Sequence, residues 1–330
     1  MEKKGILVTG GAGYIGSHVV LQLAEAHPTV VVLDNLSTGF ADAVIGAKLI
    51  IGDVKDKYLV KNILKEYSIN TVLHFAAHTI VPESVSNPLK YYANNTCATR
   101  NFLECCVEEG VKNFVFSSTA ATYGIPPTPT VTEDTPTNPI NPYGSSKLMS
   151  EWMLRDLSQA THLNYVILRY FNVAGSDPKG RIGQSTQNAT LLIKAACEVA
   201  VGKRENIHIF GVDYSTLDGT GIRDYIHVED LAKAHLLALD YLRSGGQSII
   251  LNCGYGHGYS VREVLDSVQR VYGKPIKIIE SPRRPGDPPQ LIAIADKIRD
   301  TLKWVPQCDN LDFIVKTSLD WERKLLLKDH

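Results

Sequence analysis

The chain has 330 residues, enough for one large domain and a smaller one, because a single hydrophobic core rarely grows beyond about 250–300 residues. Lys and Arg number 34 and Asp and Glu 35, and a formal net charge of −1 excludes a broad basic surface for nucleic acid or anionic membranes. The hydrophobic fraction of 44% and the charged fraction of 21% are those of a folded globular protein, which excludes a disordered or fibrous chain.

The six cysteines show no C-x-x-C pair and no spacing typical of a zinc site, so we expect free, buried thiols and no metal centre. Residues 1–4 lead directly into an apolar strand without the features of a signal peptide. No apolar stretch reaches the length that spans a membrane. These features together predict a protein of the reducing cytoplasm.

Short apolar runs alternate with helical patterns through the first half of the chain, which is the order of βαβ units. Strands are expected at 6–9, 30–34, 49–52, 71–75, 113–117 and 165–170, and helices at 17–26, 57–67, 91–109 and 143–159. This order predicts an α/β fold with a doubly wound parallel sheet of the Rossmann type.

The pattern loosens after Asn172, where loops with glycine and aspartate and a proline-rich stretch follow. We expect residues 1–172 to form a dinucleotide-binding domain and residues 173–330 a smaller α/β substrate-binding lobe. A helix at 228–242 and a strand at 249–252 are expected to return to the first sheet, so that 223–253 lie with it in space.

A glycine-rich turn follows the first strand and carries Gly10, Gly13 and Gly16. Glycines let the backbone approach a pyrophosphate, and the N-terminus of the following helix supplies free N–H groups. Such a turn is weak evidence alone, since glycine also serves ordinary turns. Asp34, at the end of the second strand, strengthens it, because its carboxylate can accept hydrogen bonds from both ribose hydroxyls of NAD. Asn35 follows in place of an arginine, which favours NAD over NADP.

Two further strand ends are candidates for contacts with the cofactor. Asp53 and Val54 follow the third strand and are expected to hold adenine. Phe75, Ala76 and Ala77 follow the fourth strand and leave room for the cofactor along the sheet edge. Neither segment is specific by itself.

Tyr143 and Lys147 stand four residues apart on the helix expected at 143–159, so both side chains lie on one face. A tyrosine with a pKa near ~10 is about one part in a thousand phenolate at pH 7, and lowering its pKa to 7 needs roughly 4 kcal/mol. One positive charge about 4 Å away supplies about that much at an effective dielectric constant near ~20. We therefore expect Lys147, helped by a positive nicotinamide ring, to make Tyr143 a usable base. An unrelated surface tyrosine and lysine would be the common explanation of an isolated Y-x-x-x-K, but here the glycine turn and Asp34 accompany it.

Ser117-Ser118-Thr119 ends the fifth strand, at the carboxyl edge where open α/β sheets bind ligands. Thr119 can hydrogen-bond a sugar hydroxyl and relay its proton to Tyr143. The alternative is that these hydroxyls only cap the next turn.

Motifs over nearly the whole chain resemble those of the UDP-glucose 4-epimerases, within the extended short-chain dehydrogenase/reductase family. They are T-G-G-A-G-Y-I-G-S-H at 9–18, L-D-N-L at 33–36, H-F-A-A at 74–77, Y-Y-A-N-N at 91–95, F-S-S-T-A-A-T-Y-G at 116–124, N-P-Y-G-S-S-K at 141–147, R-Y-F-N-V-A-G at 169–175, D-G-T-G-I-R-D-Y-I-H-V at 218–228 and R-R-P-G-D at 283–287. The resemblance implies reversible 4-epimerization of UDP-glucose and UDP-galactose. Tyr143 would take the C4 hydroxyl proton while tightly held NAD+ takes the hydride, and the 4-keto sugar would turn over and receive the hydride on its other face.

By position, the resemblance also implies which residues bind cofactor and substrate. For NAD these are Gly10, Gly13, Tyr14, Ile15, Gly16, Asp34, Asn35, Asp53, Val54, Phe75, Ala76, Ala77, Asn94, Ser117, Tyr143, Lys147 and Tyr170. For the UDP-sugar they are Thr119, Tyr143, Asn172, Phe210, Arg223, Arg284, Asp287 and Leu291. Without the resemblance, surface salt bridges would be the better explanation of the two arginines, and His227 is expected to be structural. A homodimer that pairs the helices 91–109 and 143–159 is implied as well.

The departures from the family pattern leave the substrate range open. A related dehydratase branch would carry Asp-Glu after Thr119, where this chain has Ala120-Ala121, so elimination of water is disfavoured. Thr79 stands where some members have lysine, and Leu191 where most have asparagine or histidine. Leu291 is intermediate in size at a position thought to admit or exclude a 2-acetamido group. A UDP-GlcNAc/UDP-GalNAc or UDP-pentose 4-epimerase, or a non-catalytic NAD-binding sensor, therefore remain alternatives.

Overall fold

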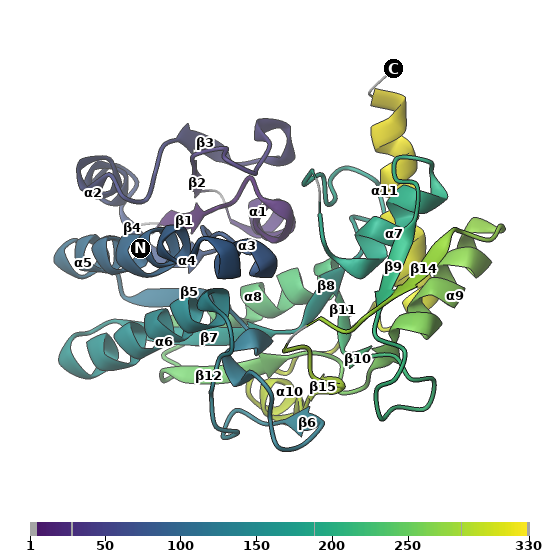
Figure 1. Cartoon of the computed structure of the whole chain (residues 1–330). Helices are drawn as coiled ribbons and strands as arrows, with labels where there is room; N and C mark the ends of the chain where they lie inside the picture. Colours follow the sequence, from purple (N-terminus) through teal and green to yellow (C-terminus); the bar gives the residue numbers. More distant parts are fainter. Residues whose placement is uncertain (1–4, 28, 188, 285, 329–330) are drawn as a thin grey trace.

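The structure, a computed structural model, describes residues 5–27, 29–187, 189–284 and 286–328 (Figure 1). The expectation for residues 1–4 lies outside this range. Seven parallel strands form the main sheet in the order β12-β7-β5-β4-β1-β2-β3. They are β1 (Gly5–Thr9), β2 (Val30–Asp34), β3 (Lys48–Ile51), β4 (Ile69–His74), β5 (Asn113–Thr119), β7 (Asn164–Tyr170) and β12 (Ile249–Cys253). The order reverses between β1 and β4, the position at which doubly wound sheets bind ligands. The fold class expected from the sequence is confirmed.

Helices cover both faces of this sheet (Figure 1). Successive side chains of a buried strand pack alternately against the helices of one face and of the other. Ile6 and Val8 of β1 join a cluster with the helices α1 (Tyr14–Ala26) and α8 (Val228–Arg243). Leu7, between them, joins the opposite cluster with α2 (Lys57–Glu66), α5 (Ala98–Glu108) and α6 (Pro142–Ala160). A strand buried on both faces needs apolar residues throughout, which is why the sequence shows apolar runs here.

The segment from 91 to 109 differs most from its expected form, a single α-helix. It begins with α4 (Pro88–Tyr91), widens into a π-helix, η2 (Tyr92–Cys97), and continues as α5. A π-helical turn bonds residue i to i+5 and shifts the following side chains around the axis, and such turns frequently occur at functional sites. The apolar pattern carries no signal for this change.

Smaller sheets, built mostly by the second half of the chain, lie beside the large one (Figure 1). Their strands are β6 (Thr130–Val131), β8 (Asn172–Ala174), β9 (Ile207–Phe210), β10 (Ile222–Arg223), β11 (Tyr225–His227), β13 (Tyr259–Ser260), β14 (Ile278–Ser281) and β15 (Gln290–Ala293). The helices α7 (Leu192–Ala200), α9 (Val261–Tyr272) and α11 (Leu311–Lys328) pack on one another, and α10 (Asp296–Leu302) lies against β12. The short α-helix α3 (Val81–Ser86) and the 3-10 helices η1 (Ala41–Ala43) and η3 (Ala120–Tyr123) complete the described elements. The domain division near residue 172 stays a prediction, but β12 and α8 do lie on the first sheet.

Candidate active site

The glycine turn after β1 is shaped by two close backbone approaches. Gly10 has a φ of +70°, and a Cβ there would lie 2.6 Å from the Ala76 nitrogen. A Cβ at Gly16 would lie 2.2 Å from the Gly10 oxygen, so neither position admits a side chain. Gly13 is different, because its Cβ would meet only the Gly10 oxygen, at 3.3 Å, and would otherwise point into open space. No side chain caps α1, which leaves the helix N-terminus available to an anion.

Asp34 is buried at the end of β2 and is held by two backbone N–H groups. Its Oδ2 accepts from Ala12 at 2.9 Å and its Oδ1 from Leu36 at 2.8 Å. Each carboxylate oxygen keeps a second lone pair, so both can still accept from ribose hydroxyls. Asn35 donates to the Asp53 carboxylate at 3.0 Å, which joins the turns after β2 and β3. Val54 is buried beside α2.

The turn after β4 lies between the glycine turn and the π-helix. The Phe75 N–H donates to the Thr9 carbonyl at 2.9 Å, and Ala76 is the residue that Gly10 approaches. The His78 N–H donates to the Asn95 side-chain oxygen at 2.8 Å, and the Asn95 amide returns a hydrogen bond to the His78 carbonyl at 2.9 Å. Asn94, the expected cofactor contact, precedes this buried asparagine on η2. Thr79 is exposed.

Tyr143 stands in the first turn of α6, which Asn141 begins by accepting a hydrogen bond from the Gly144 N–H at 2.9 Å. Its side chain is 7% exposed and is hydrogen-bonded to Thr119 at the end of β5. Burial raises the pKa of Tyr143 to about 12, and the hydrogen bond with Thr119 only partly opposes this. The protein groups alone therefore leave this pKa high, and the expected lowering by Lys147 together with a positive nicotinamide ring stays a prediction.

Lys147 lies one turn further along α6 and is 3% exposed. Its Nζ donates to the Ser117 carbonyl at 2.8 Å and lies 4.9 Å from the centre of the Phe116 ring. Burial lowers the pKa of Lys147 to about 7, against the opposing charge of Glu151. No local sequence pattern indicates this burial, which brings the pKa of Lys147 close to neutral pH.

Ser117 and Tyr170 meet a histidine that the sequence did not single out. Ser117 Oγ lies 3.0 Å from His235 Nε2, and His235 Nδ1 lies 2.9 Å from the Leu231 carbonyl. A carbonyl only accepts, so Nδ1 donates and the Ser117 hydroxyl donates to Nε2. The rings of Phe75 and Tyr170 pack on this imidazole, at 4.8 and 6.3 Å between centroids. Burial lowers the pKa of His235 to about 4, so it is neutral.

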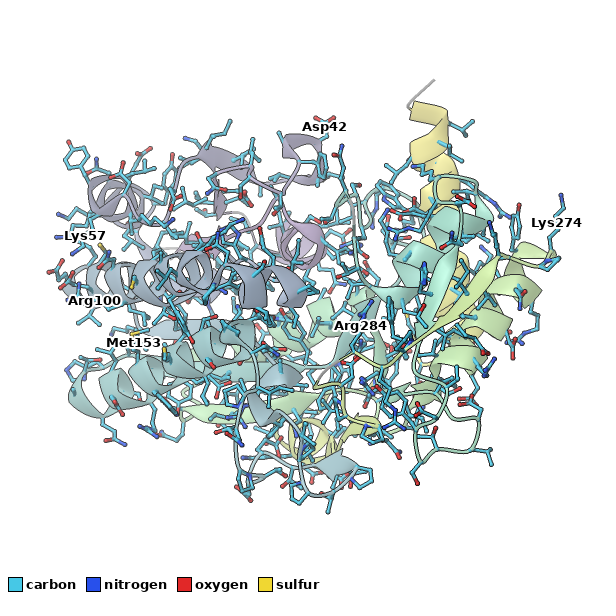
Figure 2. All side chains as sticks on the ribbon, viewed as in Figure 1. Asp42, Lys57, Arg100, Met153, Lys274 and Arg284 are labelled. Atoms are coloured by element: carbon cyan, nitrogen blue, oxygen red, sulfur yellow. The ribbon has the colours of Figure 1, made fainter. Side chains whose placement is uncertain are left out.

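The residues expected around the UDP-sugar come from the second half of the chain. Arg223 on β10 pairs in register with Leu291 on β15, and its Nη2 lies 3.8 Å from Asp287 Oδ1. The Arg284 guanidinium lies over the Phe210 ring at 3.8 Å. Figure 2 shows Arg284 between the large sheet and the smaller sheets and helices of the second half of the chain, hereafter the second lobe. Asn172 begins β8, next to Tyr170 at the end of β7. Leu191 precedes α7 and is partly exposed.

Comparison with known proteins supports, over nearly the whole chain, the family that the sequence motifs indicate. The model of the NAD dependent epimerase/dehydratase family matches residues 6–254. The chain belongs to this family. The UDP-glucose 4-epimerase of Azospirillum brasilense is 54% identical over 321 residues, 97% of this chain and 92% of the relative. A solved UDP-glucose 4-epimerase from Brucella ovis in complex with NAD is 42% identical with a TM-score of 0.93 and covers 96% of this chain and 98% of that one. The UDP-Glc/GlcNAc 4-epimerase of Campylobacter jejuni is 50% identical with a TM-score of 0.86, covering 97% and 99%.

As a member of the NAD dependent epimerase/dehydratase family, the protein uses NAD, and its residues fit that cofactor. The open face of Gly13 admits a pyrophosphate, and Asp34 keeps acceptor capacity for the ribose. Ile15 faces the core from the first turn of α1. The Tyr14 hydroxyl donates to the Gly175 carbonyl at 2.6 Å, so that side chain joins the glycine turn to the loop after β8.

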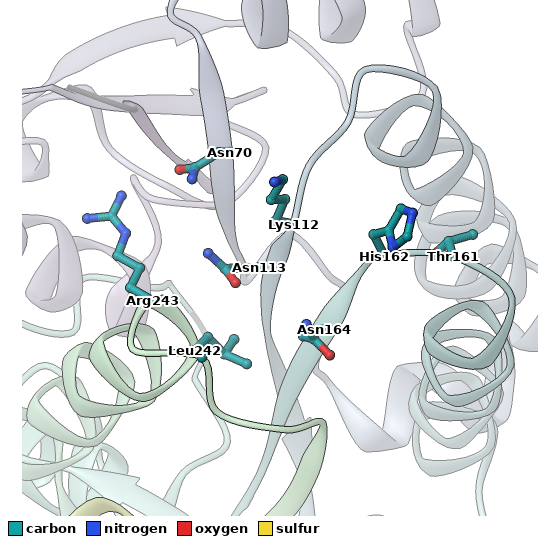
Figure 3. A pocket seen from close by; sticks show the side chains of 9 residues that line it. Asn70, Lys112, Asn113, Thr161, His162, Asn164, Leu242 and Arg243 are labelled. Carbon is teal, nitrogen blue, oxygen red and sulfur yellow. The ribbon is translucent and has the colours of Figure 1, made fainter. Parts of the chain in front are cut away.

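One polar pocket lies away from this constellation (Figure 3). Asn70, Asn113 and Asn164, which line it, stand at the amino ends of β4, β5 and β7. The candidate site occupies the opposite, carboxyl ends, where open α/β sheets bind ligands. The pocket therefore contributes nothing to the site. Within the described ranges, no helix is long and apolar enough to cross a membrane.

Proposed function

We propose that the protein interconverts UDP-glucose and UDP-galactose by NAD-dependent 4-epimerization. The observation that carries the proposal is the buried Tyr143, hydrogen-bonded to Thr119 and followed one turn later by Lys147, at the sheet edge that holds the glycine turn. Relatives named UDP-glucose 4-epimerase are 54% and 49% identical over 97% of this chain, which supports the choice of reaction.

In this proposal Tyr143 takes the proton of the sugar C4 hydroxyl, and Thr119 binds that hydroxyl and relays the proton. Bound NAD supplies the hydride acceptor and donor at C4, so there is no net redox change. On the return, Tyr143 gives its proton back to the C4 oxygen. Ser117, Tyr170 and Phe75 line the cofactor side, with neutral His235 behind them.

The pKa of Tyr143 shows how much positive charge the reaction requires. Bringing a pKa of about 12 down to 7 needs roughly 7 kcal/mol. A single ammonium group about 4 Å away supplies only about 4 kcal/mol at an effective dielectric constant near ~20. Lys147 alone is therefore insufficient, and the positive nicotinamide ring must add its charge. This requirement would make Tyr143 a base only when oxidised cofactor is bound.

The substrate would lie against the second lobe, where Arg223 and Arg284 would bind the diphosphate with their planar guanidinium groups. Phe210 offers an aromatic face beside Arg284, and Asp287 holds Arg223 in place. Asn172 and Leu291 would border the sugar.

A second candidate substrate pair is UDP-GlcNAc and UDP-GalNAc. Leu291 is smaller than a tyrosine, and the 50% identical Campylobacter jejuni relative is named a UDP-Glc/GlcNAc 4-epimerase. Purified protein given UDP-galactose, UDP-GlcNAc and a UDP-pentose in turn would separate the candidates. Inert UDP-galactose beside turnover of UDP-GlcNAc would remove the first assignment.

The rival of another class is a non-catalytic NAD-binding sensor. It would bind the cofactor, detected as nucleotide released on denaturation, but would convert none of the UDP-sugars. Turnover that depends on Tyr143 would exclude it.

We further propose a homodimer formed by the 91–109 segment and α6. Trp152 on α6 is 47% exposed, and Leu89 on α4, just before the 91–109 segment, is 76% exposed, although both are large apolar side chains that an interface would bury. Sedimentation should give the mass of a dimer, and Trp152→Glu should shift it toward the monomer. A monomeric wild-type protein would refute this arrangement.

A cytoplasmic location is proposed from the cysteines, which are all free, with Cys105, Cys106, Cys197 and Cys253 buried. Reduced thiols of this kind suit a reducing compartment. Cell fractionation tests the location, and recovery outside the cytoplasm would contradict it.

A further inference from the structure

We propose that Glu151, fixed by Arg169 and Ser118, is a positioning residue whose buried negative charge keeps Lys147 in its ammonium form. The inference rests on the proposed function, because it assigns Lys147 the role of stabilising a Tyr143 phenolate.

The three residues Tyr143, Lys147 and Glu151 follow one another at intervals of four along α6, so they share its buried face. Glu151 is 2% exposed, and a carboxylate so deeply buried requires partners. Arg169 on β7, itself 4% exposed, binds it with two prongs, Nη2 to Oε2 at 2.6 Å and Nε to Oε1 at 3.0 Å. This bidentate geometry is the strong form of a charged hydrogen bond.

Each of the last three residues of β5 contacts one of these three α6 residues. The Ser117 carbonyl accepts from Lys147, the Ser118 hydroxyl donates to the Glu151 carboxylate, and Thr119 is hydrogen-bonded to Tyr143. Three consecutive strand residues thus hold three successive turns of the helix. Ser118 and Glu151 are the members of this set that the proposed reaction leaves without a role.

The surroundings of Lys147 contain one source of negative charge. From β5 it meets the Ser117 carbonyl and the Phe116 ring. From β4 it faces His74, which is neutral because burial lowers the pKa of this histidine to about 3. Tyr143 on its own helix is uncharged at neutral pH.

Glu151 is therefore the one carboxylate that acts on Lys147 among the described groups, and its charge opposes the effect of burial on the Lys147 pKa. Arg169 binds both oxygens of this carboxylate. It also donates to the Tyr123 hydroxyl at 3.1 Å, which fixes its orientation. Its positive charge pairs with the buried Glu151 carboxylate and compensates for the loss of water around it.

The test is the pH dependence of kcat in the holoenzyme. Loss of the Lys147 proton should define the basic limb, since the uncharged amine no longer stabilises a phenolate. Glu151→Gln keeps the shape of the side chain and removes its charge, so the basic limb of the kcat profile should move to lower pH by about one unit or more. Above this limb kcat should fall about tenfold, and at acidic pH the loss of kcat should be smaller.

Two variants separate charge from structure. Glu151→Asp keeps the carboxylate and should return the limb toward its wild-type position. Ser118→Ala removes one hydrogen bond to Glu151 but no charge, and should leave the limb in place. If Glu151→Gln fails to fold because Arg169 is left unpaired, the double change Glu151→Met with Arg169→Met removes both charges, and should still move the limb downward, but by less, because the opposing positive charge of Arg169 is lost as well.

A second readout needs no turnover. The ultraviolet difference titration of tyrosinate, taken as the protein minus its Tyr143→Phe form, follows the Tyr143 pKa directly with NAD bound. This pKa should rise in Glu151→Gln. An unmoved limb and an unmoved Tyr143 titration in folded, NAD-loaded variants would overturn the inference. If the wild-type protein converted no UDP-sugar, the proposed function would fail, while the titration would still decide the part played by Glu151.

Discussion

The two sides of the candidate site are built differently. On the side of the large sheet, Tyr143, Lys147 and Glu151 are buried and each is tied to a consecutive residue of β5. On the side of the second lobe, Arg223 and Asp287 form a looser ion pair at 3.8 Å, and Arg284 lies on an aromatic ring without an ion pair of its own among the described contacts.

This difference indicates which groups are fixed before substrate arrives. Catalytic groups must be held in position, because small displacements of reacting groups cost large factors in rate. Binding groups can adjust, since a guanidinium that contacts a diphosphate contributes mainly to affinity. Substitutions on the sheet side should therefore lower kcat, and those on the lobe side should raise KM.

The largest effect is expected from Tyr143→Phe. Losing the proton acceptor should lower kcat by about 10³–10⁴-fold, the upper range for general acid–base groups. The NAD content should stay unchanged, because the Tyr143 hydroxyl contributes neither to the glycine turn nor to the contacts of Asp34. Steady-state kinetics with UDP-galactose and release of nucleotide on denaturation measure the two quantities. A kcat within tenfold of wild type would show that another group moves the proton.

Lys147→Met should lower kcat by about 10²-fold while making the cofactor-free protein more stable. The folded state depresses the pKa of Lys147 to about 7, whereas an unfolded lysine titrates near ~10.4. Between these two pKa values the folded protein thus binds fewer protons than the unfolded chain. Lys147 therefore lowers the free energy of unfolding by its full amount below pH ~7, and by less as the pH rises toward ~10.4.

Removing the lysine should therefore raise Tm at pH 7, and the gain should shrink as the pH approaches the unfolded value. Thermal melts of both proteins across this range give the comparison. A variant that melts lower at pH 7 would show that the hydrogen bond to the Ser117 carbonyl outweighs the cost of burial.

The parts of the site that depend on local spacing can be predicted from the sequence. Apolar runs predict the parallel strands, and an interval of four residues predicts that Tyr143 and Lys147 share one helix face. Contacts between residues distant in the chain cannot be predicted in this way. Ser117 and His235 are 118 residues apart, and no local pattern links them.

The same limit applies to the electrostatics of Tyr143. Spacing shows which groups are neighbours, but the pKa depends on burial, which arises only when α6 packs on β5 and β7. A tyrosine in the first turn of a helix gives no local sign of how completely other elements will cover it.

The smallest predicted effect sharpens the comparison on the lobe side. Arg284→Ala should raise KM for UDP-galactose about tenfold and change kcat by less, since one charge-assisted hydrogen bond contributes about 1.5–3 kcal/mol. Arg283 is the matched control, because its guanidinium lies over Tyr214 at 4.2 Å and is paired with Asp213 at 2.6 Å. Arg283→Ala should leave KM within about twofold, as an exposed ion pair contributes little. Equal increases in KM for the two changes would mean that substrate binding responds to the overall charge of this loop. A fall in kcat with unchanged KM for Arg284→Ala would place Arg284 among the fixed catalytic groups.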